Sequence, residues 1–180
     1  EGGAWRCYPF IEGGYCLQAA ETPSQFAAAG RSFGRFLRLL EDSPADTLYE
    51  TIEKFHDTRN RLKNFKAALA ADPLGRAKDV QPEIQFVLDR EADCAVLMDL
   101  LEAGKLPLRV THNDTKLNNI ILDGETGEGL CVIDLDTIMP GLVLNDYGDS
   151  IRFGATTAAE DERDLDKVHF DRALYTAYTE

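Results

Sequence analysis

Residues 111–119 read THNDTKLNN and carry three asparagines, an aspartate, a histidine and a lysine. They lie between LPLRV at 106–110 and IILD at 120–123, two mainly apolar runs. Such runs predict short strands. A turn between strands does not need this density of polar side chains. The stretch therefore predicts a loop that carries chemistry.

The residues after this loop predict a β-hairpin. IILD and the later run LCVID at 130–134 flank GETGEG, which supplies glycines for a turn. A hairpin brings its second strand back beside its first, so Asp134 returns close to Asn119. Asp114 precedes Asn119 by five residues in the same loop. We expect Asp114, Asn119 and Asp134 to converge on one pocket.

This set of side chains suits phosphoryl transfer. Mg²⁺ prefers hard oxygen ligands, which the Asp134 carboxylate and the Asn119 amide both offer. The reaction also needs a carboxylate that orients the attacking hydroxyl and accepts its proton, as Asp114 can. The alternative for Asp114 and Asn119 is a polar turn that only links strands or caps a helix. Asp134 at the return of the hairpin argues against that alternative.

HNDTKLNN at 112–119 resembles the HxDxxxxN catalytic loop of the aminoglycoside phosphotransferase and choline kinase family, small-molecule kinases with a protein-kinase-like fold. VIDLDT at 132–137 occupies the position of the metal-binding aspartate of that family. The wording continues through NDYGDSIRFGA at 145–155 and looks most like the N-acetylhexosamine 1-kinase branch. The resemblance implies an α+β, mainly helical fold: the C-terminal lobe of a protein-kinase-like fold with a catalytic-loop β-hairpin.

The resemblance also implies roles and ligands. Asp114 would be the catalytic base, Asn119 and Asp134 would hold Mg²⁺, and His112 would brace the loop. ATP and Mg²⁺ would be the cofactors. The phosphate acceptor would be a small-molecule alcohol, foremost a sugar such as an N-acetylhexosamine.

The opening WRCYPFIEGG at 5–14 looks like the last strand of an ATP-binding lobe followed by the hinge. Backbone groups of Phe10, Ile11 and Glu12 would then meet adenine. We expect residues 1–14 to be this strand and hinge, and 15–180 to be a truncated C-terminal catalytic and substrate lobe.

A kinase of this type also needs a glycine-rich loop and a lysine on an early strand. The first lysine of this sequence is Lys54, which falls in a predicted helical region, and no such loop precedes it. We therefore expect the 180 residues to be a fragment with little or no kinase activity on its own.

Several polar residues near the loop have roles that the sequence leaves open. We expect Lys116 to reach a phosphate oxygen. Asp136 is either a carboxylate behind the metal ligands or a turn residue. Asp146 and Asp149 either contact substrate or support the loop from beneath, and Arg152 either pairs with one of them or contacts substrate. The acidic run at 160–166 predicts a solvated surface; it adds no candidate.

Capping and periodicity predict the helices. Thr22, Pro23 and Gln25 match an N-cap, a first helical position and a capping box. Residues 47–71 are expected to be helical in part, 80–103 to form one long helix, and a last helix to start near 170. The segment up to residue 11 predicts a strand whose aromatic side chains enter the core.

Two other kinds of protein deserve comparison. VIDLDT is close to the DxDxT signature of haloacid dehalogenase-type phosphatases, with Asp134 as nucleophile and Asp136 as general acid. Ile138 stands where the threonine belongs, and only 42 residues follow it. A pseudokinase-like binding module is the non-catalytic alternative. The presence of Asp114, Asn119 and Asp134 argues against a degraded site.

Composition excludes further classes. Nineteen basic and 32 acidic residues give a net charge of −13, which argues against binding to nucleic acid or to anionic membranes. No apolar stretch approaches the roughly 20 residues that span a bilayer, and the first residues do not resemble a secretory signal. The four cysteines form no CxxC pair, so neither zinc nor a disulfide framework is expected. We expect a cytoplasmic protein, and no sequence feature fixes its oligomeric state.

Overall fold

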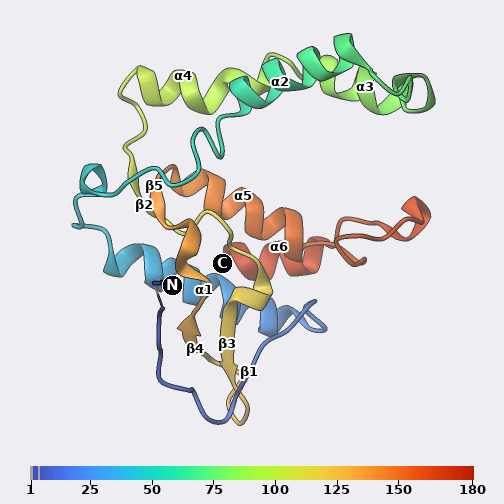
Figure 1. Ribbon diagram of the computed structural model, residues 1–180. Helices are drawn as coiled ribbons and strands as arrows, with labels where there is room; N and C mark the ends of the chain where they lie inside the picture. The colour runs from blue at the N-terminus through green and yellow to red at the C-terminus, as the bar shows by residue number, and fades with distance from the viewer. Residues whose placement is uncertain (1, 4) are drawn as a thin grey trace. The chain divides into compact units, whose positions relative to one another are not determined.

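The computed structural model describes residues 2–3 and 5–180 (Figure 1). The chain forms two compact units. Unit 1 comprises Glu1–Leu39, Asp114–Asp136 and Tyr147–Glu180, and unit 2 comprises Leu40–Asn113 and Thr137–Asp146.

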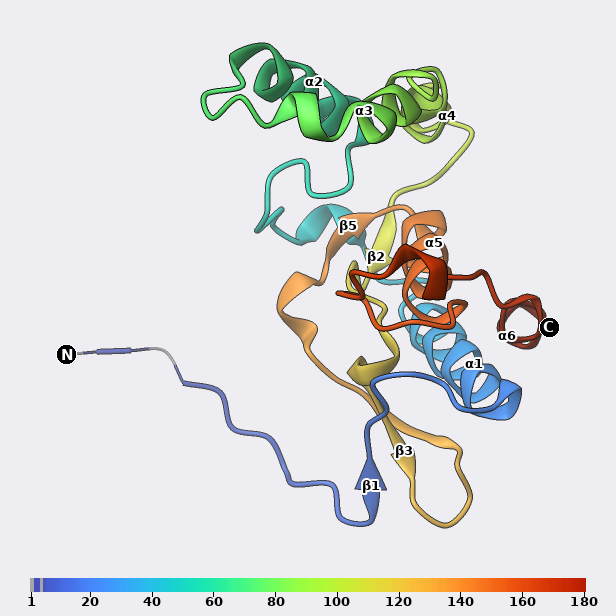
Figure 2. The same cartoon turned by 90° about the vertical axis from the view of Figure 1, so that its right-hand side faces the viewer.

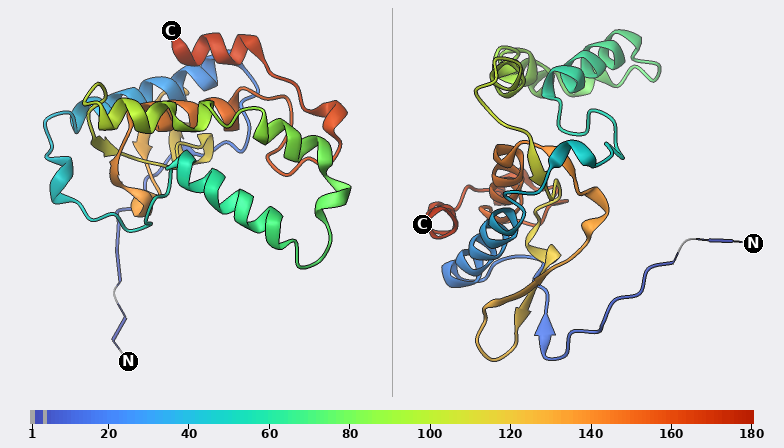
Figure 3. Two further views of the ribbon diagram at one scale, coloured as in Figure 1. Left: turned by 90° about the horizontal axis from the view of Figure 1, so that it is seen from above. Right: turned by 90° about the vertical axis from the view of Figure 1, so that its left-hand side faces the viewer.

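Unit 1 combines a small antiparallel sheet with helices. Its strands are β1 (Gly14–Tyr15), β3 (Ile120–Asp123) and β4 (Gly129–Val132), in the order β1-β3-β4. Figure 2 shows β1 beside β3. The helix α1 (Pro23–Leu39) packs against β4 and against α6 (Arg172–Thr179), and α1 and α6 lie side by side in Figure 3.

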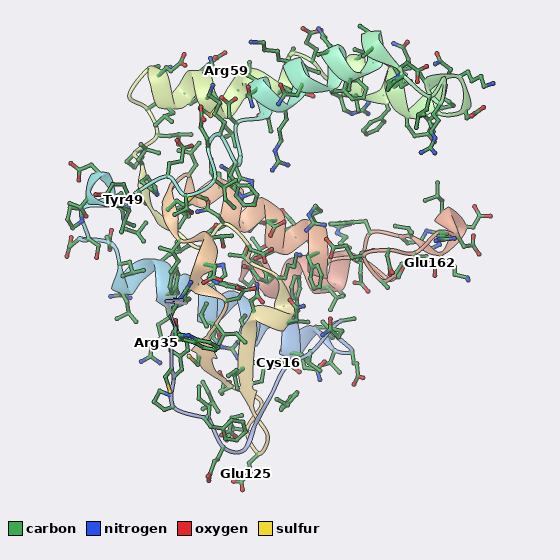
Figure 4. The ribbon with its side chains drawn as sticks, in the orientation of Figure 1. Cys16, Arg35, Tyr49, Arg59, Glu125 and Glu162 are labelled. Atoms are coloured by element: carbon green, nitrogen blue, oxygen red, sulfur yellow. The ribbon has the colours of Figure 1, made fainter. Side chains whose placement is uncertain are left out.

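The β3–β4 pair lies where the sequence places a hairpin. Ile120 pairs with Val132 and Ile121 with Cys131, and the register shifts before Leu122. The turn is closed by Asp123, whose Oδ1 accepts the main-chain N–H groups of the two residues numbered 125 and 126. These hydrogen bonds lower the pKa of Asp123. Figure 4 labels Glu125 at the tip of this hairpin.

The core of unit 1 lies between α1, the hairpin and α6. Alternate residues of β3 face inward because successive side chains of a strand point to opposite faces. The buried apolar cluster consists of Phe26, Ala28, Ala29, Phe33, Leu117, Ile120, Leu122, Ala155 and Leu174.

The start of α1 confirms the predicted capping box. Thr22 Oγ1 accepts the Gln25 N–H at 3.4 Å, and Gln25 Oε1 accepts the Thr22 N–H at 3.1 Å. Pro23 occupies the first helical position, where its missing N–H has no intrahelical partner to lose.

Alanine substitutions at two glycines of α1 are expected to have opposite effects on stability. A Cβ at Gly30 would lie 2.7 Å from the main-chain oxygen of Tyr178 in α6, which cannot move without displacing the helix. Gly30→Ala is therefore expected to lower the free energy of unfolding by about 1–3 kcal/mol. A Cβ at Gly34 would meet nothing within 4 Å beyond its chain neighbours and the adjacent backbone of α1. Gly34→Ala is expected to raise it by about 0.5–1 kcal/mol, since alanine is the better helix former.

Urea denaturation of both variants measures the two changes. Equal effects in the two variants would contradict the close packing of α1 on α6, since each substitution adds the same methyl group to the same helix.

Unit 2 combines a two-stranded antiparallel sheet with a group of short helices. The strands are β2 (Arg109–Thr111) and β5 (Met139–Gly141). The helices are α2 (Thr58–Ala71), α3 (Gln81–Leu88) and α4 (Val96–Glu102). Arg59 of α2, labelled in Figure 4, pairs with Asp99 and Glu102 of α4.

Helix α5 (Val143–Gly154) begins in unit 2 and continues into unit 1. The predictions from sequence did not extend to a helix here. Short 3-10 turns complete the structure at Ala45–Thr47, Ala77–Asp79, Asp93–Ala95, Leu117–Asn119, Leu135–Thr137 and Leu165–Lys167. Within the described residues, no helix has both the length and the apolar character required to cross a membrane.

The prediction of one long helix over 80–103 is wrong. The α-helical hydrogen-bond pattern ends after α3 and resumes at α4, with turns and the 3-10 helix Asp93–Ala95 between them. Between them, the N–H of Arg90 donates to the oxygen of Val87, which is the tighter spacing of a 3-10 turn. The intervening DREAD at 89–93 has no large apolar side chain. It therefore lacks the apolar face through which tertiary packing stabilises a helix.

The prediction of a strand ending at residue 11 is also wrong. Among residues 2–3 and 5–13, none lies in a strand, and the first strand is β1. The aromatic side chains do not enter a core: Trp5 is 94% exposed, and Tyr8 and Phe10 are exposed as well. Aromatic residues favour strands only where a partner strand and packing are available, because β-propensity largely measures that packing.

Candidate active site

The Asp114 carboxylate is held by Asn119. Asn119 Nδ2 donates to the main-chain oxygen of Asp114 at 2.8 Å and to Asp114 Oδ2 at 3.2 Å. The turn Leu117–Asn119 positions this amide, and buried Leu117 anchors the turn in the core of unit 1. The Asp114 side chain itself is 26% exposed. A hydroxyl group arriving from solvent can therefore reach a carboxylate whose position is fixed.

Asp134 follows the end of β4, and the backbone of the preceding residue pairs with that of Asn119. The N–H of Ile133 donates to the oxygen of Asn119 at 2.9 Å, which continues the hairpin ladder by one step. Asp134 has a left-handed backbone with φ of 60°. That conformation costs roughly 1–2 kcal/mol for most L-residues, and aspartate and asparagine adopt it most readily. Such strain is concentrated at functional sites.

A pocket of about 750 Å³ in unit 1 is lined by Asp134 and Asp136 on one side and by the segment before β1 on the other. Phe10 and Ile11 line it; Glu12 is not among the described residues that do. Asp136 forms an ion pair with Arg6. The lining is mainly apolar apart from these charged groups, so the pocket suits a flat, largely uncharged ring.

Two side chains of helix α5 bind the backbone of Thr115, the residue after Asp114, one at its N–H and one at its oxygen. Asp149 Oδ2 accepts the Thr115 N–H at 3.1 Å, and Ser150 Oγ donates to the Thr115 oxygen at 2.8 Å. Tyr178 of α6 donates in turn to Ser150 Oγ at 2.7 Å. Of the two roles left open for Asp149, this geometry fits support of the loop.

Lys116 lies between two carboxylates. Its Nζ is 3.5 Å from Asp114 Oδ1 and 3.8 Å from Glu160 Oε2. Arg152 pairs with Asp149 and with Glu160, each at 2.9 Å. Arg152 therefore makes the structural pairing that the sequence allowed. Glu160 is exposed, in agreement with the predicted solvated surface, and it also meets both cations.

In unit 2, Asp146 holds the start of the loop. Its carboxylate is buried and accepts the His112 N–H at 2.9 Å and the Asn113 N–H at 2.8 Å. Burial raises the pKa of Asp146 and outweighs these two hydrogen bonds, which lower it. His112 is fully buried, and its main-chain oxygen accepts the Thr137 hydroxyl at 2.7 Å. This position fits a bracing role for His112 better than a reacting one.

The sequence matches the family model described as the phosphotransferase enzyme family over residues 1–179. The chain belongs to this family. The match supports the resemblance to aminoglycoside phosphotransferases and choline kinases, and it indicates a protein-kinase-like fold, with which the α+β structure agrees.

The residues of the phosphotransferase fit a magnesium ion. The amide nitrogen of Asn119 faces Asp114, so its oxygen, the atom able to ligate a hard cation, is turned away from Asp114. Asp134 is exposed and directly follows Ile133, whose N–H donates to the main-chain oxygen of Asn119. Among residues 2–3 and 5–180, no group of three or more His, Cys, Asp or Glu side chains could hold a metal. Mg²⁺ needs no such cage, because it is usually bound by one or two carboxylates together with water and phosphate oxygens.

Three contributors to the site were missed from sequence. Thr115 acts through its main-chain N–H and oxygen and Ser150 through its hydroxyl, and such contacts leave no pattern in a sequence. Glu160 lies 44 residues after Lys116 and eight after Arg152. The only available signal was the phrase GDS at 148–150, which the resemblance already covered.

Asp146→Asn is expected to lower the free energy of unfolding by about 1–3 kcal/mol, because a buried donor loses its acceptor. The two carboxylate oxygens accept one N–H each, from His112 and Asn113. An amide has one oxygen, so its NH₂ group would face the second N–H.

Thermal or urea unfolding measures this loss. Asp42→Asn makes the same chemical change at an exposed position of unit 2 and should alter stability by no more than about 0.5 kcal/mol. Similar stability in the two variants would contradict the buried role of Asp146.

Proposed function

We propose that the phosphotransferase transfers the γ-phosphoryl group of ATP to a hydroxyl group of a small molecule, foremost an N-acetylhexosamine. The observation that carries this proposal is the pairing of Asp114 with Asn119, with Asp134 returned beside Asn119 by the hairpin. Asp114 would supply an accessible carboxylate, and Asn119 and Asp134 would supply two oxygen ligands. These are the two parts that phosphoryl transfer requires of a protein.

Asp114 would act as the catalytic base. It would orient the acceptor hydroxyl and take its proton while the new oxygen–phosphorus bond forms. The bond between the γ-phosphorus and the bridging oxygen breaks, and ADP leaves with that electron pair. Asn119 keeps the carboxylate in place through the 3.2 Å hydrogen bond. Lys116, whose Nζ lies 3.5 Å from Asp114 Oδ1, would meet an oxygen of the transferring phosphate.

Asn119 and Asp134 would hold Mg²⁺. When bound, the ion neutralises negative charge on the phosphate oxygens and orients them. Asp136, held by Arg6, would stand behind Asp134 and not ligate the ion directly.

We further propose that adenine occupies the pocket of about 750 Å³, against Phe10 and Ile11. Residues 1–14 would then include the hinge, and 15–180 would form the catalytic and substrate lobe. The 180 residues alone are expected to turn over little or no ATP. The glycine-rich loop and early lysine that hold ATP phosphates in such kinases do not occur in this sequence.

The choice of an N-acetylhexosamine rests on the resemblance of THNDTKLNN and NDYGDSIRFGA to that branch. An aminoglycoside, an amino alcohol or homoserine would require the same catalytic loop. The family assignment favours the phosphotransferase over a phosphatase built on Asp134 and Asp136, and over a non-catalytic binding module.

A kinase assay of the full-length protein tests the proposal. N-Acetylglucosamine, N-acetylgalactosamine, an aminoglycoside, choline and homoserine are offered with ATP or GTP and Mg²⁺. We expect phosphorylation of an N-acetylhexosamine. Phosphorylation of another alcohol alone would replace the acceptor class and keep the reaction, whereas no turnover with any acceptor would overturn the reaction.

A further inference from the structure

Five charged side chains of unit 1 form a closed series around the catalytic loop, here called the ionic ring. Its members alternate in sign and are Asp114, Lys116, Glu160, Arg152 and Asp149. The series closes through the backbone, because Asp149 accepts the N–H of Thr115, the residue between the first two members. The ionic ring therefore begins and ends on the loop that carries Asp114.

Both carboxylate oxygens of Glu160 take part in the ionic ring. Oε1 accepts from Arg152 at 2.9 Å, and Oε2 lies 3.8 Å from Lys116 Nζ. Burial lowers the pKa of Arg152, but the hydrogen bonds to Asp149 and Glu160 together with the charges of these two carboxylates raise it by more. Arg152 therefore stays charged and fixes the position from which Glu160 meets Lys116.

The ring can contribute little to stability. The side chains of Glu160 and Arg152 are 46% and 51% exposed. Ion pairs at such exposure are worth about 0–1 kcal/mol. We therefore expect Glu160 to act by positioning Lys116, because it contributes little to the stability of the fold.

A lysine with a single carboxylate beside it would form a close ion pair with that carboxylate. The Lys116 ammonium group would then cover an oxygen of Asp114 that the acceptor hydroxyl needs. A second carboxylate within reach of the ammonium group divides its interaction between two partners. The observed distances, 3.5 Å to Asp114 and 3.8 Å to Glu160, show this division.

We propose that Glu160 is a positioning residue, which holds the Lys116 ammonium group away from full contact with Asp114 and available to the transferring phosphate. This inference rests on the proposed function. It gives a role to the acidic segment after α5, of which no described residue lines the pocket of about 750 Å³.

The test is steady-state kinetics of the full-length protein with ATP and the preferred acceptor of the panel above. Glu160→Gln keeps a hydrogen-bond acceptor for Arg152 and removes the charge that Lys116 meets. We expect kcat to fall about tenfold with both KM values changed less than about twofold, since the loss is one of orientation in the transition state. Glu160→Asp should restore at least about half of the lost rate, because the charge returns.

A double-variant comparison separates positioning from packing. If Glu160 acts through Lys116, Glu160→Gln should have no further effect in a Lys116→Met background. Arg152→Gln, which releases Glu160 and leaves Lys116 in place, should reproduce the loss and stands in if Glu160→Gln does not fold. Asp161→Asn removes the same charge from the next, exposed position and should behave as wild type.

The outcomes distinguish the two proposals. Wild-type turnover that Asp114→Asn abolishes but Glu160→Gln leaves unchanged would overturn this inference alone. Losses that multiply in the Glu160→Gln and Lys116→Met combination would also overturn it. Absence of turnover in the wild type with every acceptor would overturn the proposed function and this inference together.

Discussion

Asp114→Asn is expected to lower kcat of the full-length protein by about 100- to 10,000-fold, the usual contribution of a positioned general base. The substitution keeps the size and shape of the side chain. Its amide oxygen can still accept the hydrogen bond from Asn119 Nδ2, which reaches Asp114 Oδ2 at 3.2 Å. The loop should therefore remain folded while the group that accepts the hydroxyl proton is lost.

Steady-state rates with ATP and the preferred acceptor measure this effect. KM for ATP should change by less than about threefold, because Asp114 acts in the transition state and not in nucleotide binding. Asp161→Asn is the matched control, since it removes one carboxylate of unit 1 at an exposed position. A kcat for Asp114→Asn within a factor of three of the control would exclude Asp114 as the base.

The parts of the structure that sequence predicted well depend on neighbours along the chain. The capping box of α1 involves residues three apart, and the β3–β4 pair is joined by a short turn. The pattern for each is complete within a few residues, so a single sequence is sufficient. The approach of Asp134 to Asn119 follows from the same short connection.

The parts that sequence failed to predict depend on distant partners. The segment before β1 has the aromatic content of a strand, yet its aromatic side chains are exposed because no described strand pairs with it. Residues 80–103 have enough apolar positions for a long helix, but DREAD interrupts the apolar face. Local composition was a poor guide wherever packing decided the conformation.

The candidate site shows the same division. Asp114, Asn119 and Asp134 follow from a motif and a hairpin. The roles of Asp146 and Asp149 could not be decided from NDYGDS, since either a substrate or the backbone could donate hydrogen bonds to their carboxylates. The structure gives each of them main-chain N–H partners in the loop. Glu160 could not be found at all, because its partners Lys116 and Arg152 are reached only after the chain has folded.

Asp134→Asn is expected to weaken Mg²⁺ or Mn²⁺ binding to the full-length protein by about 100-fold or more. Loss of a hydrogen-bonding partner behind a metal ligand already costs about 10- to 100-fold. The choice of asparagine matters, because Asp134 has a φ of 60° and asparagine tolerates the left-handed region that alanine does not. The variant therefore removes one ligand charge without adding backbone strain.

Direct metal titration measures this prediction independently of turnover, and Asp136→Asn is its control. Asp136 carries the same charge two residues later and lines the same pocket, but it is paired with Arg6. If Asp134 ligates the ion, Asp136→Asn should weaken metal binding by less than about fivefold, because a charge in solvent acts weakly at that distance. Equal losses in the two variants would mean that the ion responds to the general negative charge of this pocket. Asp134 would then have no special position, and the left-handed turn that presents it would need another explanation.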